Sequence, residues 1–410
     1  MRIVFYCQYV WGMGHLFRSL ELARALAGHR VTLVAGGPEV AVDPPGHVEL
    51  VRLPGLHMDE QFTTLLAGAS GASVAALQQA RAAALAEVFE RVRPQVFIVE
   101  LYPFGRTAFG FELEPLLEAV RQGRYGPVRT VCSLRDVLVE KRDPAAYEER
   151  VLEALHRWFD LLLIHSDERL LPLGETFSRF EEIRIPKVHT GFVAARPDPE
   201  NGRRLRGGLG LAPDEKLVIA SCGGGRSGYR LIQAVLQAFR RLRGRAVHLE
   251  AFCGPFMNAA EYDELHALRG AGMNVRRFTP RLIDHLAVAD LSISLAGYNT
   301  CMNLLATGVP ALVLPYSRQR EQPLRVEKLK PYLPIDVLDE GDLDPEHLAR
   351  AVERGLCVRR SAAVSGLNLD GAATAARLLE EWAAAASPPS GAPACDRPAA
   401  DPRSQEERTP

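Results

Sequence analysis

The amino-acid sequence predicts an α/β protein made of two doubly wound parallel sheets. Over most of the 410 residues, short apolar runs alternate with amphipathic stretches, which is typical of parallel strands joined by helices. Residues 161–164 are apolar at every position, as expected of a strand that helices cover on both faces. The chain is also longer than one hydrophobic core usually serves, so we expect two domains.

Each predicted domain has its own series of elements. In the first half the pattern predicts strands at residues 3–7, 31–35, 48–53, 96–101, 128–134 and 161–165, and helices at 16–27, 72–92 and 144–159. After residue 191 it predicts strands at 217–222, 247–253, 275–278, 291–294 and 311–314. Helices of this second series should begin near Gly228, Ala259, Ile283, Thr300, Gln322 and Pro345.

Turn-forming and charged residues over 194–210 predict a linker between the two series. We therefore expect a first domain over residues 1–193, a second over 194–370, and a further helix over 371–386. Residues 387–410 are rich in Pro, Ser, Gly, Asp and Arg and almost without apolar side chains. That composition predicts a disordered tail.

Charge and composition exclude several classes of protein. The 49 basic and 50 acidic residues nearly cancel, so an electrostatic grip of the whole protein on nucleic acid is not expected. No stretch of 18 apolar residues could span a bilayer, and the N-terminus has the pattern of a strand, not of a signal peptide. None of the seven cysteines lies in CxxC spacing, which indicates reduced thiols in a cytoplasmic protein.

The first predicted strand is followed by a glycine-containing loop. Gly12 and Gly14 would let the backbone approach a ligand at the start of a helix, but Phe17 stands where a dinucleotide fingerprint has its third glycine. An NAD site is therefore a weak interpretation. His15 follows directly, and an imidazole there could take a proton near neutral pH. The alternative is a histidine that only caps its helix.

A second glycine-rich loop, residues 222–228, lies between a predicted strand and a predicted helix. Such a turn favours an anion site, and Arg226 and Ser227 add a charge and a hydroxyl. The loop has no lysine, so it is not a P-loop and nucleotide hydrolysis is not expected. The alternative is a tight structural turn.

A third loop, residues 294–300, precedes a predicted helix, and Glu321 and Gln322 follow the next strand. Asn299 or Thr300 could simply be the N-cap of that helix. Glu321 and Gln322 could likewise be ordinary residues of a first helical turn.

Together these loops resemble the GT-B glycosyltransferases, and most closely the family 28 branch that contains the lipid II-forming N-acetylglucosaminyltransferase. The resemblance rests on Gly12-x-Gly14-His15, Gly223-Gly224-Gly225-Arg226-Ser227-Gly228, Ala289-Asp290-Leu291-x-Ile293-Ser294, Ala296-Gly297-Tyr298-Asn299-Thr300, Gly308-Val309-Pro310-Ala311 and Glu321-Gln322. The segments 100–106, 112–117 and 134–136 are similar to a less characterised group of predicted glycosyltransferases.

This resemblance implies two Rossmann-like domains that face each other across a cleft. The first would bind the acceptor and the second the nucleotide-sugar donor, with the helix over 371–386 crossing back to the first. The implied donor-binding residues are Gly12, Gly14, Gly224, Gly225, Arg226, Ser227, Gly228, Phe278, Gly297, Tyr298, Asn299, Thr300, Asn303, Glu321 and Gln322.

The candidate catalytic residues are His15, Glu100 and Asp136. The resemblance implies that His15 lies near the reacting carbon, as base or phosphate partner. No metal or other cofactor is expected, because a helix dipole and Arg226 can offset the charge of the leaving diphosphate. The pair Asp342 and Asp344 precedes a proline and has the pattern of a helix N-cap.

One position departs from the family pattern. Asn303 stands where the lipid II enzyme's pattern has a glutamate, and an amide accepts ribose hydroxyls less well than a carboxylate. The donor's identity or affinity should therefore differ.

The leading hypothesis is an inverting, metal-independent sugar transfer from a nucleotide diphosphosugar, UDP-linked, to an unknown acceptor. A UDP-sugar hydrolase or 2-epimerase of the same fold is one alternative, and an inactive sugar-nucleotide-binding protein is another. A lipid-linked acceptor would bring the chain into peripheral contact with a membrane, for which Trp11, Phe62, Leu65 and Leu66 could supply apolar surface.

Overall fold

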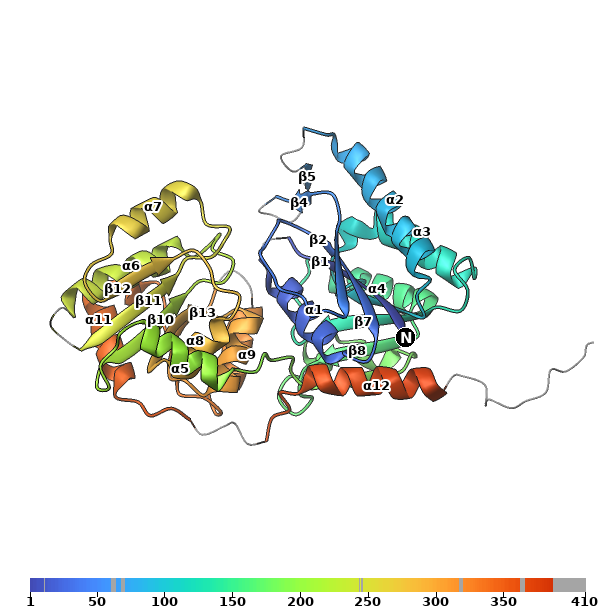
Figure 1. Cartoon of the computed structure of the whole chain (residues 1–410). Helices are drawn as coiled ribbons and strands as arrows, with labels where there is room; N and C mark the ends of the chain where they lie inside the picture. The colour runs from blue at the N-terminus through green and yellow to red at the C-terminus, as the bar shows by residue number, and fades with distance from the viewer. Residues whose placement is uncertain are drawn as a thin grey trace, which may run out of the picture.

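The computed structural model describes residues 1–10, 12–59, 64–67, 71–242, 244, 246–316, 320–361 and 366–385. In these residues the chain forms two large parallel sheets, and Figure 1 shows each sheet with its own helices. The predicted α/β fold with two doubly wound sheets is confirmed. The predicted tail, residues 387–410, lies outside the described residues.

The first sheet has seven strands within the described residues, in the order β3-β2-β1-β6-β7-β8-β9, and all neighbours are parallel. They are β1 (Arg2–Gln8), β2 (Arg30–Gly36), β3 (Val48–Arg52), β6 (Val96–Glu100), β7 (Arg129–Arg135), β8 (Leu161–His165) and β9 (Lys187–His189). The order reverses between β1 and β6, and ligands of such sheets bind at the carboxyl ends of the strands beside that point. Glu100 and His165 end two of these strands.

The helices of the first half cover this sheet. They are α1 (Gly14–Ala25), α2 (Val74–Val92), α3 (Gly110–Arg121) and α4 (Pro144–Trp158), and a hairpin of β4 (Leu56–Met58) and β5 (Leu65–Ala67) lies beside α2. Ser73 and Asp143 cap α2 and α4 by accepting backbone N–H groups. The first helix begins two residues earlier than predicted, so that His15 belongs to its first turn.

The second sheet has six strands in the described part of the chain, in the order β12-β11-β10-β13-β14-β15, again all parallel. They are β10 (Lys216–Ser221), β11 (Val247–Phe252), β12 (Met273–Arg276), β13 (Leu291–Leu295), β14 (Ala311–Leu314) and β15 (Ile335–Val337). Its helices are α6 (Tyr229–Arg241), α7 (Ala259–Ala267), α8 (Leu282–Val288), α9 (Tyr298–Thr307), α10 (Glu321–Leu329) and α11 (Pro345–Leu356). Phe278 lies beyond the strand that was predicted to contain it.

The segment predicted to bridge the two series lies between β9 and β10, but it contains a helix that was not predicted, α5 (Pro199–Gly208). Asp198 caps α5, and Pro199 begins it with a backbone angle that suits a first helical turn. The buried carboxylate of Asp284 in α8 accepts bonds from the Asp198 N–H (2.8 Å) and from Asn201 Nδ2 (2.5 Å). Residues that cap a helix also form turns, which is why the composition suggested a linker.

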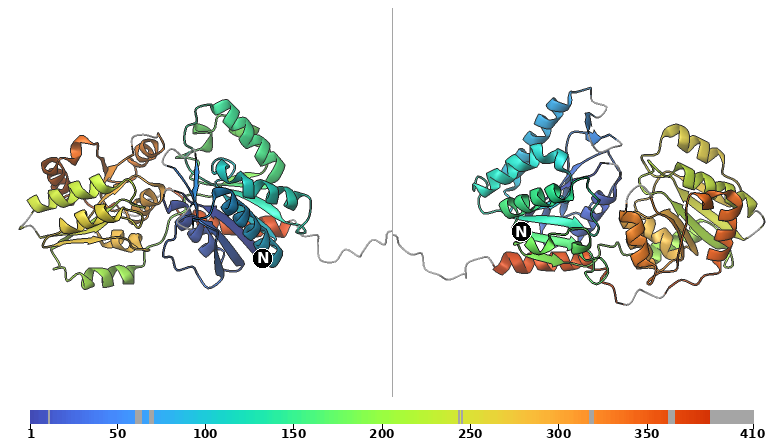
Figure 2. Two further views of the ribbon diagram at one scale, coloured as in Figure 1. Left: turned by 90° about the horizontal axis from the view of Figure 1, so that it is seen from above. Right: turned by 180° about the vertical axis from the view of Figure 1, so that it is seen from behind.

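The last helix, α12 (Gly371–Ala385), returns to the first sheet after the second sheet is complete (Figures 1 and 2). Ala375, Ala376 and Leu379 are buried in one core cluster with Ile3 of β1. The Arg129 guanidinium lies 4.5 Å from the ring centre of Trp382. The chain therefore crosses between its two halves twice.

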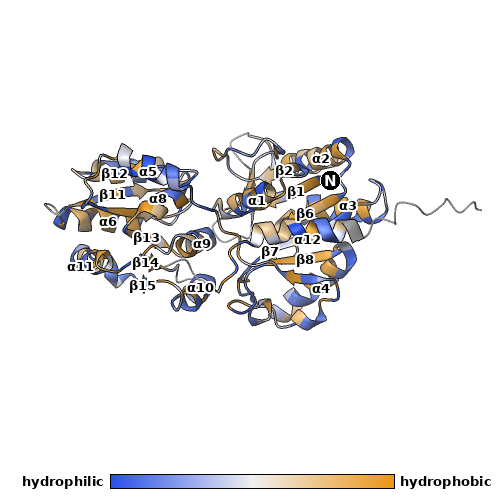
Figure 3. Ribbon diagram, turned by 60° about the horizontal axis from the view of Figure 1, so that its bottom comes forward, coloured by the Kyte–Doolittle hydropathy of each residue, from blue (hydrophilic) through white to orange (hydrophobic). Residues whose placement is uncertain are grey.

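Figure 3 shows mostly hydrophobic strands enclosed by helices that carry hydrophilic positions. None of the helices in the described ranges has both the length and the apolar character that crossing a bilayer requires. Among the described cysteines, Cys7, Cys132, Cys222, Cys253 and Cys301 are buried and Cys357 is exposed, and all six are free thiols.

Candidate functional site

His15 lies in the first turn of α1, directly after the loop that carries Gly12 and Gly14. The N-cap position is Met13, which makes no side-chain hydrogen bond, so the alternative that His15 only caps its helix is wrong. A Cβ atom on Gly12 would meet no atom within 4 Å, and one on Gly14 would lie 3.8 Å from Asn299 Nδ2. The loop thus has open space on one side and the second half of the chain on the other.

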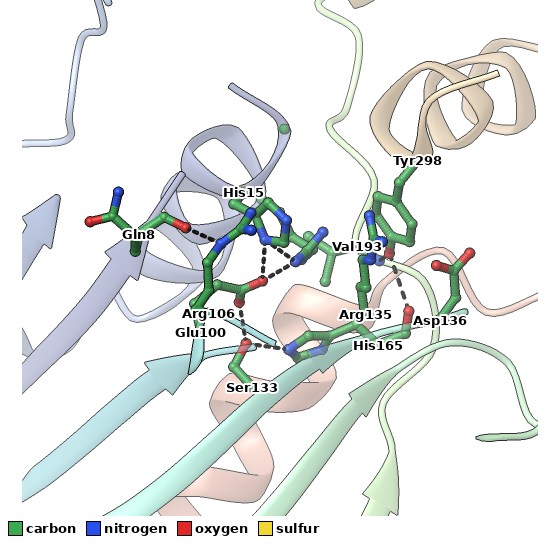
Figure 4. Close-up of polar contacts among 12 residues, drawn as sticks. Gln8, His15, Glu100, Arg106, Ser133, Arg135, Asp136, His165, Val193 and Tyr298 are labelled. Carbon is green, nitrogen blue, oxygen red and sulfur yellow. Dashed lines mark hydrogen bonds and ion pairs between the residues drawn. The ribbon is translucent and has the colours of Figure 1, made fainter. Parts of the chain in front are cut away.

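His15 and Glu100, two of the candidate catalytic residues, lie in direct contact (Figure 4). His15 Nδ1 is 3.0 Å from Oε1 of Glu100, which ends β6 and is fully buried. Arg18, one turn farther along α1, pairs with the same oxygen. Ser133 Oγ donates to the other oxygen, Oε2, at 2.7 Å.

The charges around this pair fix its protonation. Burial raises the pKa of Glu100, but the Arg18 guanidinium, the hydrogen bond with His15 and the nearby His165 together outweigh burial and hold that pKa well below its usual range. Burial and the nearby charge of Arg106 lower the pKa of His15 to about 3, although Glu100 opposes this shift. At neutral pH a bond from a neutral His15 to an ionised Glu100 requires Nδ1–H, which leaves a lone pair on Nε2. The Arg18 guanidinium, 3.1 Å from the same Nδ1, would instead require that nitrogen to accept.

Asp136, the third candidate, is placed apart from this pair. Figure 4 shows it on the far side of Tyr298 from His15. Its carboxylate accepts two bonds from Arg325, at 2.6 and 2.9 Å, and both side chains are fully buried. Burial raises the pKa of Asp136, but the charge and hydrogen bonds of Arg325, with the charge of Arg135, together bring that pKa below its usual value. The carboxylate is therefore an ionised partner of α10.

Glu321, predicted to bind the donor, belongs to the same ion-pair network. One of its oxygens accepts from Arg325 at 2.9 Å and the other from Arg135 at 2.5 Å. A sugar hydroxyl at Glu321 would therefore share this carboxylate with two arginines. Gln322 accepts the backbone N–H of Tyr316 at 2.9 Å.

The first turn of α9 joins the two halves of the chain. Asn299 Nδ2 donates to the backbone oxygen of Gly14 at 3.0 Å, and Tyr298 OH donates to the backbone oxygen of His165 at 3.2 Å. The N-cap of α9 is Gly297, without a side-chain bond, so the interpretation of Asn299 or Thr300 as that cap is wrong. The predicted donor residues Gly297 to Thr300 therefore lie beside the loop of His15.

The glycine-rich loop joins β10 to α6. Gly223 and Gly225 have φ of +61° and +97°, and a Cβ on Gly225 would lie 2.4 Å from the backbone oxygen of Cys253. This close packing supports the structural alternative for Gly225, and a Cβ on Gly228 would similarly overlap Cys222.

The same loop also has the features of an anion site. Gly228 is the N-cap of α6. It makes no side-chain hydrogen bond, so no side chain of the N-cap residue caps the N–H groups of the first turn. Arg226 and Ser227 are exposed, and the Arg226 guanidinium lies 5.8 Å from the ring centre of Phe256. Phe256 N donates to the backbone oxygen of Gly224. The glycine packing thus supports the structural alternative, and the anion site stays a prediction that this backbone could accommodate.

Phe278 and Asn303 have different surroundings. The ring of Phe278 packs edge-on against Phe17 of α1, with centroids 6.0 Å apart. Asn303 lies half-buried in α9, and its backbone oxygen accepts from Thr307 Oγ1 at 2.7 Å.

Several residues of the site were not predicted from the sequence. They are Arg18, Ser133, His165 and Arg325. Arg18 follows His15 by three residues, the spacing of one helical face, and His165 ends the second predicted strand after that of Glu100. Those two signals could have identified Arg18 and His165 from the sequence.

Comparison with known proteins places the second half in a family. Residues 218–364 match the model of the glycosyltransferase family 28 C-terminal domain. The chain is 34% identical over 139 residues to a UDP-N-acetylglucosamine–N-acetylmuramyl-(pentapeptide) pyrophosphoryl-undecaprenol N-acetylglucosamine transferase of Desulforudis audaxviator (strain MP104C). That match covers 30% of this chain and 35% of the relative's own length. The protein of the same name from Desulfitobacterium hafniense (strain DSM 10664 / DCB-2) is 22% identical over 360 residues, covering 83% and 87%.

Solved structures show the same fold. The calicheamicin glycosyltransferase CalG4 superposes with a TM-score of 0.59 at 18% identity, covering 95% of this chain and all of that one. The UDP-GlcNAc 2-epimerase of Methanocaldococcus jannaschii has a TM-score of 0.56 at 12% identity, covering 93% of this chain and 100% of that chain. The predicted resemblance to GT-B glycosyltransferases is confirmed, and the matches together support a glycosyltransferase of GT-B fold.

Proposed function

We propose that this chain transfers a sugar from a nucleotide diphosphosugar, UDP-linked, to a hydroxyl group of an acceptor bound by its first half. The observation that carries the proposal is the contact of His15 Nδ1 with Glu100, at 3.0 Å, beside the start of α9. A neutral imidazole oriented by an ionised carboxylate is the arrangement of a general base. The names of the two relatives support a UDP-sugar as donor.

The reaction we propose is a single displacement that inverts the anomeric carbon. Nε2 of His15 takes the proton of the acceptor hydroxyl while the oxygen of that hydroxyl bonds to the anomeric carbon. The bond from that carbon to the diphosphate breaks, and UDP leaves with the electron pair. Glu100 stabilises the imidazolium that forms, and the negative donor offsets the nearby charge of Arg106, which opposes protonation.

In this proposal the second half holds the donor. The first turn of α6 and Arg226 bind the diphosphate, so that the helix dipole and one cation offset the charge of the leaving group without a resident metal. The backbone near Phe278 faces the nucleobase, and the first turns of α9, including Asn303, receive the ribose and the sugar.

The acceptor would dock on the first half, near the hairpin of β4 and β5, where Leu66 is exposed. The relatives' names include an undecaprenol acceptor, which supports a lipid-linked molecule. Such an acceptor would place this protein in the cytoplasm at a membrane surface. Of the predicted apolar patch, Trp11 and Phe62 lie outside the described residues.

The 2-epimerase of similar fold supports one rival, a reaction of the donor alone, and Asn303 motivates a second, an inactive binding protein. Incubation with a panel of UDP-sugars, with and without acceptors, separates them. We expect UDP release that requires an acceptor, and loss of that release in His15→Gln. Free sugar or an epimer formed without acceptor would favour the hydrolase or epimerase. Binding of UDP with no product would favour the inactive protein.

A further inference from the structure

We infer that Ser133, His165 and Thr190 form a one-way chain of hydrogen bonds that positions Glu100 against His15. This inference rests on the proposed role of His15 as the base. None of the three residues would touch substrate. They are positioning residues that act through Glu100.

The chain crosses the carboxyl edge of the first sheet from strand to strand. Glu100 pairs in register with Ser133 of β7, His165 ends the next strand, and Thr190 directly follows β9. Ser133 Oγ lies 2.7 Å from Glu100 Oε2 and 3.0 Å from His165 Nε2 (Figure 4). His165 Nδ1 lies 2.8 Å from Thr190 Oγ1. All four side chains are at most 1% exposed.

Only one direction of proton donation gives every member of this chain of hydrogen bonds a partner. The ionised Glu100 can only accept, so Ser133 spends its single proton on Oε2 and its oxygen must accept from His165 Nε2–H. Burial lowers the pKa of His165 to about 3, so the neutral ring has one N–H and its Nδ1 accepts from Thr190. If Thr190 donated instead to the backbone oxygen of Gly191, 3.0 Å away, two lone pairs would face each other in a buried site.

The chain of hydrogen bonds therefore ends at the carboxylate of Glu100, which Arg18, Ser133 and His15 hold. A carboxylate held on both oxygens cannot rotate, so Oε1 stays opposite His15 Nδ1 and the lone pair of that ring stays on Nε2. Loss of the Ser133 hydroxyl frees one oxygen of Glu100 and removes the acceptor that fixes Nε2–H on His165, whereas loss of the Thr190 hydroxyl leaves Nδ1 of His165 without its donor. Both changes should reach His15 without touching the second half of the chain.

Helix α9, on the donor side, contacts His165, the middle residue of this chain of hydrogen bonds. Tyr298 OH donates to the backbone oxygen of His165 and accepts from Val193 N at 3.1 Å. The ring of Tyr298 also lies 5.0 Å from the guanidinium of Arg18. The positions of His165 and Arg18 thus depend on how α9 docks.

The test is imidazole ¹⁵N NMR on the full chain, combined with steady-state kinetics. We expect opposite tautomers, Nδ1–H on His15 and Nε2–H on His165, assigned with His15→Gln and His165→Gln. Ser133→Ala should mix the tautomers of His165, whereas Thr190→Val, which removes only the donor to Nδ1, should keep Nε2–H and shift the Nδ1 resonance. Thr190→Ser, which keeps the hydroxyl, should give the wild-type spectrum. Ser133→Ala should lower kcat by up to about 100-fold and leave the donor KM within about twofold, because only the orientation of Glu100 changes.

An Nδ1–H tautomer on His165 would overturn the inference. So would wild-type kcat in both Ser133→Ala and Thr190→Val with their folds intact by circular dichroism. A wild-type protein with no turnover of any UDP-sugar would instead contradict the proposed function, while the tautomers would still decide whether the chain exists.

Discussion

His15 and His165 are held neutral inside the protein, and this makes stability depend on pH. Burial is the first cause for both, and each has a pKa of about 3 in the fold against 6.5 when unfolded. As pH falls from 6.5 towards 3, the unfolded chain binds protons that the folded chain does not, so folding stability is lost on acidification.

We predict that the free energy of unfolding falls by up to about 1.4 kcal/mol per pH unit for each histidine below pH 6.5. Urea unfolding at pH 7, 6 and 5 measures this slope, and His15→Gln should reduce it. Equal stability at the three pH values would show that the two rings are not kept neutral.

Replacing the single residue Asn303 tests which donor group the protein binds at this position. Asn303→Glu should tighten binding of a UDP-sugar by about 1 kcal/mol, because a ribose diol bonds better to a carboxylate than to an amide. Titration calorimetry of wild type and variant with UDP and UDP-sugars gives the difference. Weaker binding would indicate that Asn303 faces a different donor group.

The sequence identified His15 and Glu100 separately but not their contact. Eighty-five residues separate them in the chain, and only the pairing of β1 with β6 brings α1 and Glu100 together. Arg325 and Asp136 are 189 residues apart for the same reason. Such pairs depend on tertiary packing, which local patterns do not contain.

At the scale of elements, helix α10 is attached to the first half by buried charge. Arg325 is fully buried between Asp136 and Glu321, so removing it would leave the buried carboxylate of Asp136 without its ion-pair partner and Glu321 with Arg135 alone. We predict that Arg325→Met destabilises the fold by about 3–5 kcal/mol.

Thermal or urea unfolding measures that loss, and Arg320→Met is its matched control. Arg320 pairs with Glu140 at the surface, 3.4 Å apart, and an exposed pair of this kind contributes at most about 1 kcal/mol. Equal stability of the two variants would mean that the buried network does not hold α10.

Most elements with strong apolar patterns were predicted, although α3 was not, and several short or polar elements were missed. Strands β8 and β14 have the predicted bounds, because β14 is apolar throughout and β8 is apolar up to the His165 that ends it. The three-residue strands β9 and β15 and the helix α5 were missed, since short edge strands and polar helices are stabilised by neighbours more than by their own pattern.

At the scale of the whole molecule, α12 closes the chain back onto the first sheet. Leu379 is 2% exposed in the core cluster of β1, so Leu379→Ala should destabilise the protein by about 2–5 kcal/mol through lost burial and a cavity. Arg377→Ala, on the exposed face of the same helix, is the control. Urea unfolding that gave both variants wild-type stability would show that α12 adds nothing to the first half.

The proposed reaction needs both halves of the chain, because His15 of the first half is the base for a donor held by the second. The direct test compares His15→Ala with wild type for UDP affinity by calorimetry and for turnover of the UDP-sugar with acceptor. We predict that turnover falls by about 10²–10⁴-fold while UDP affinity stays nearly unchanged. Full turnover in His15→Ala would contradict the claim.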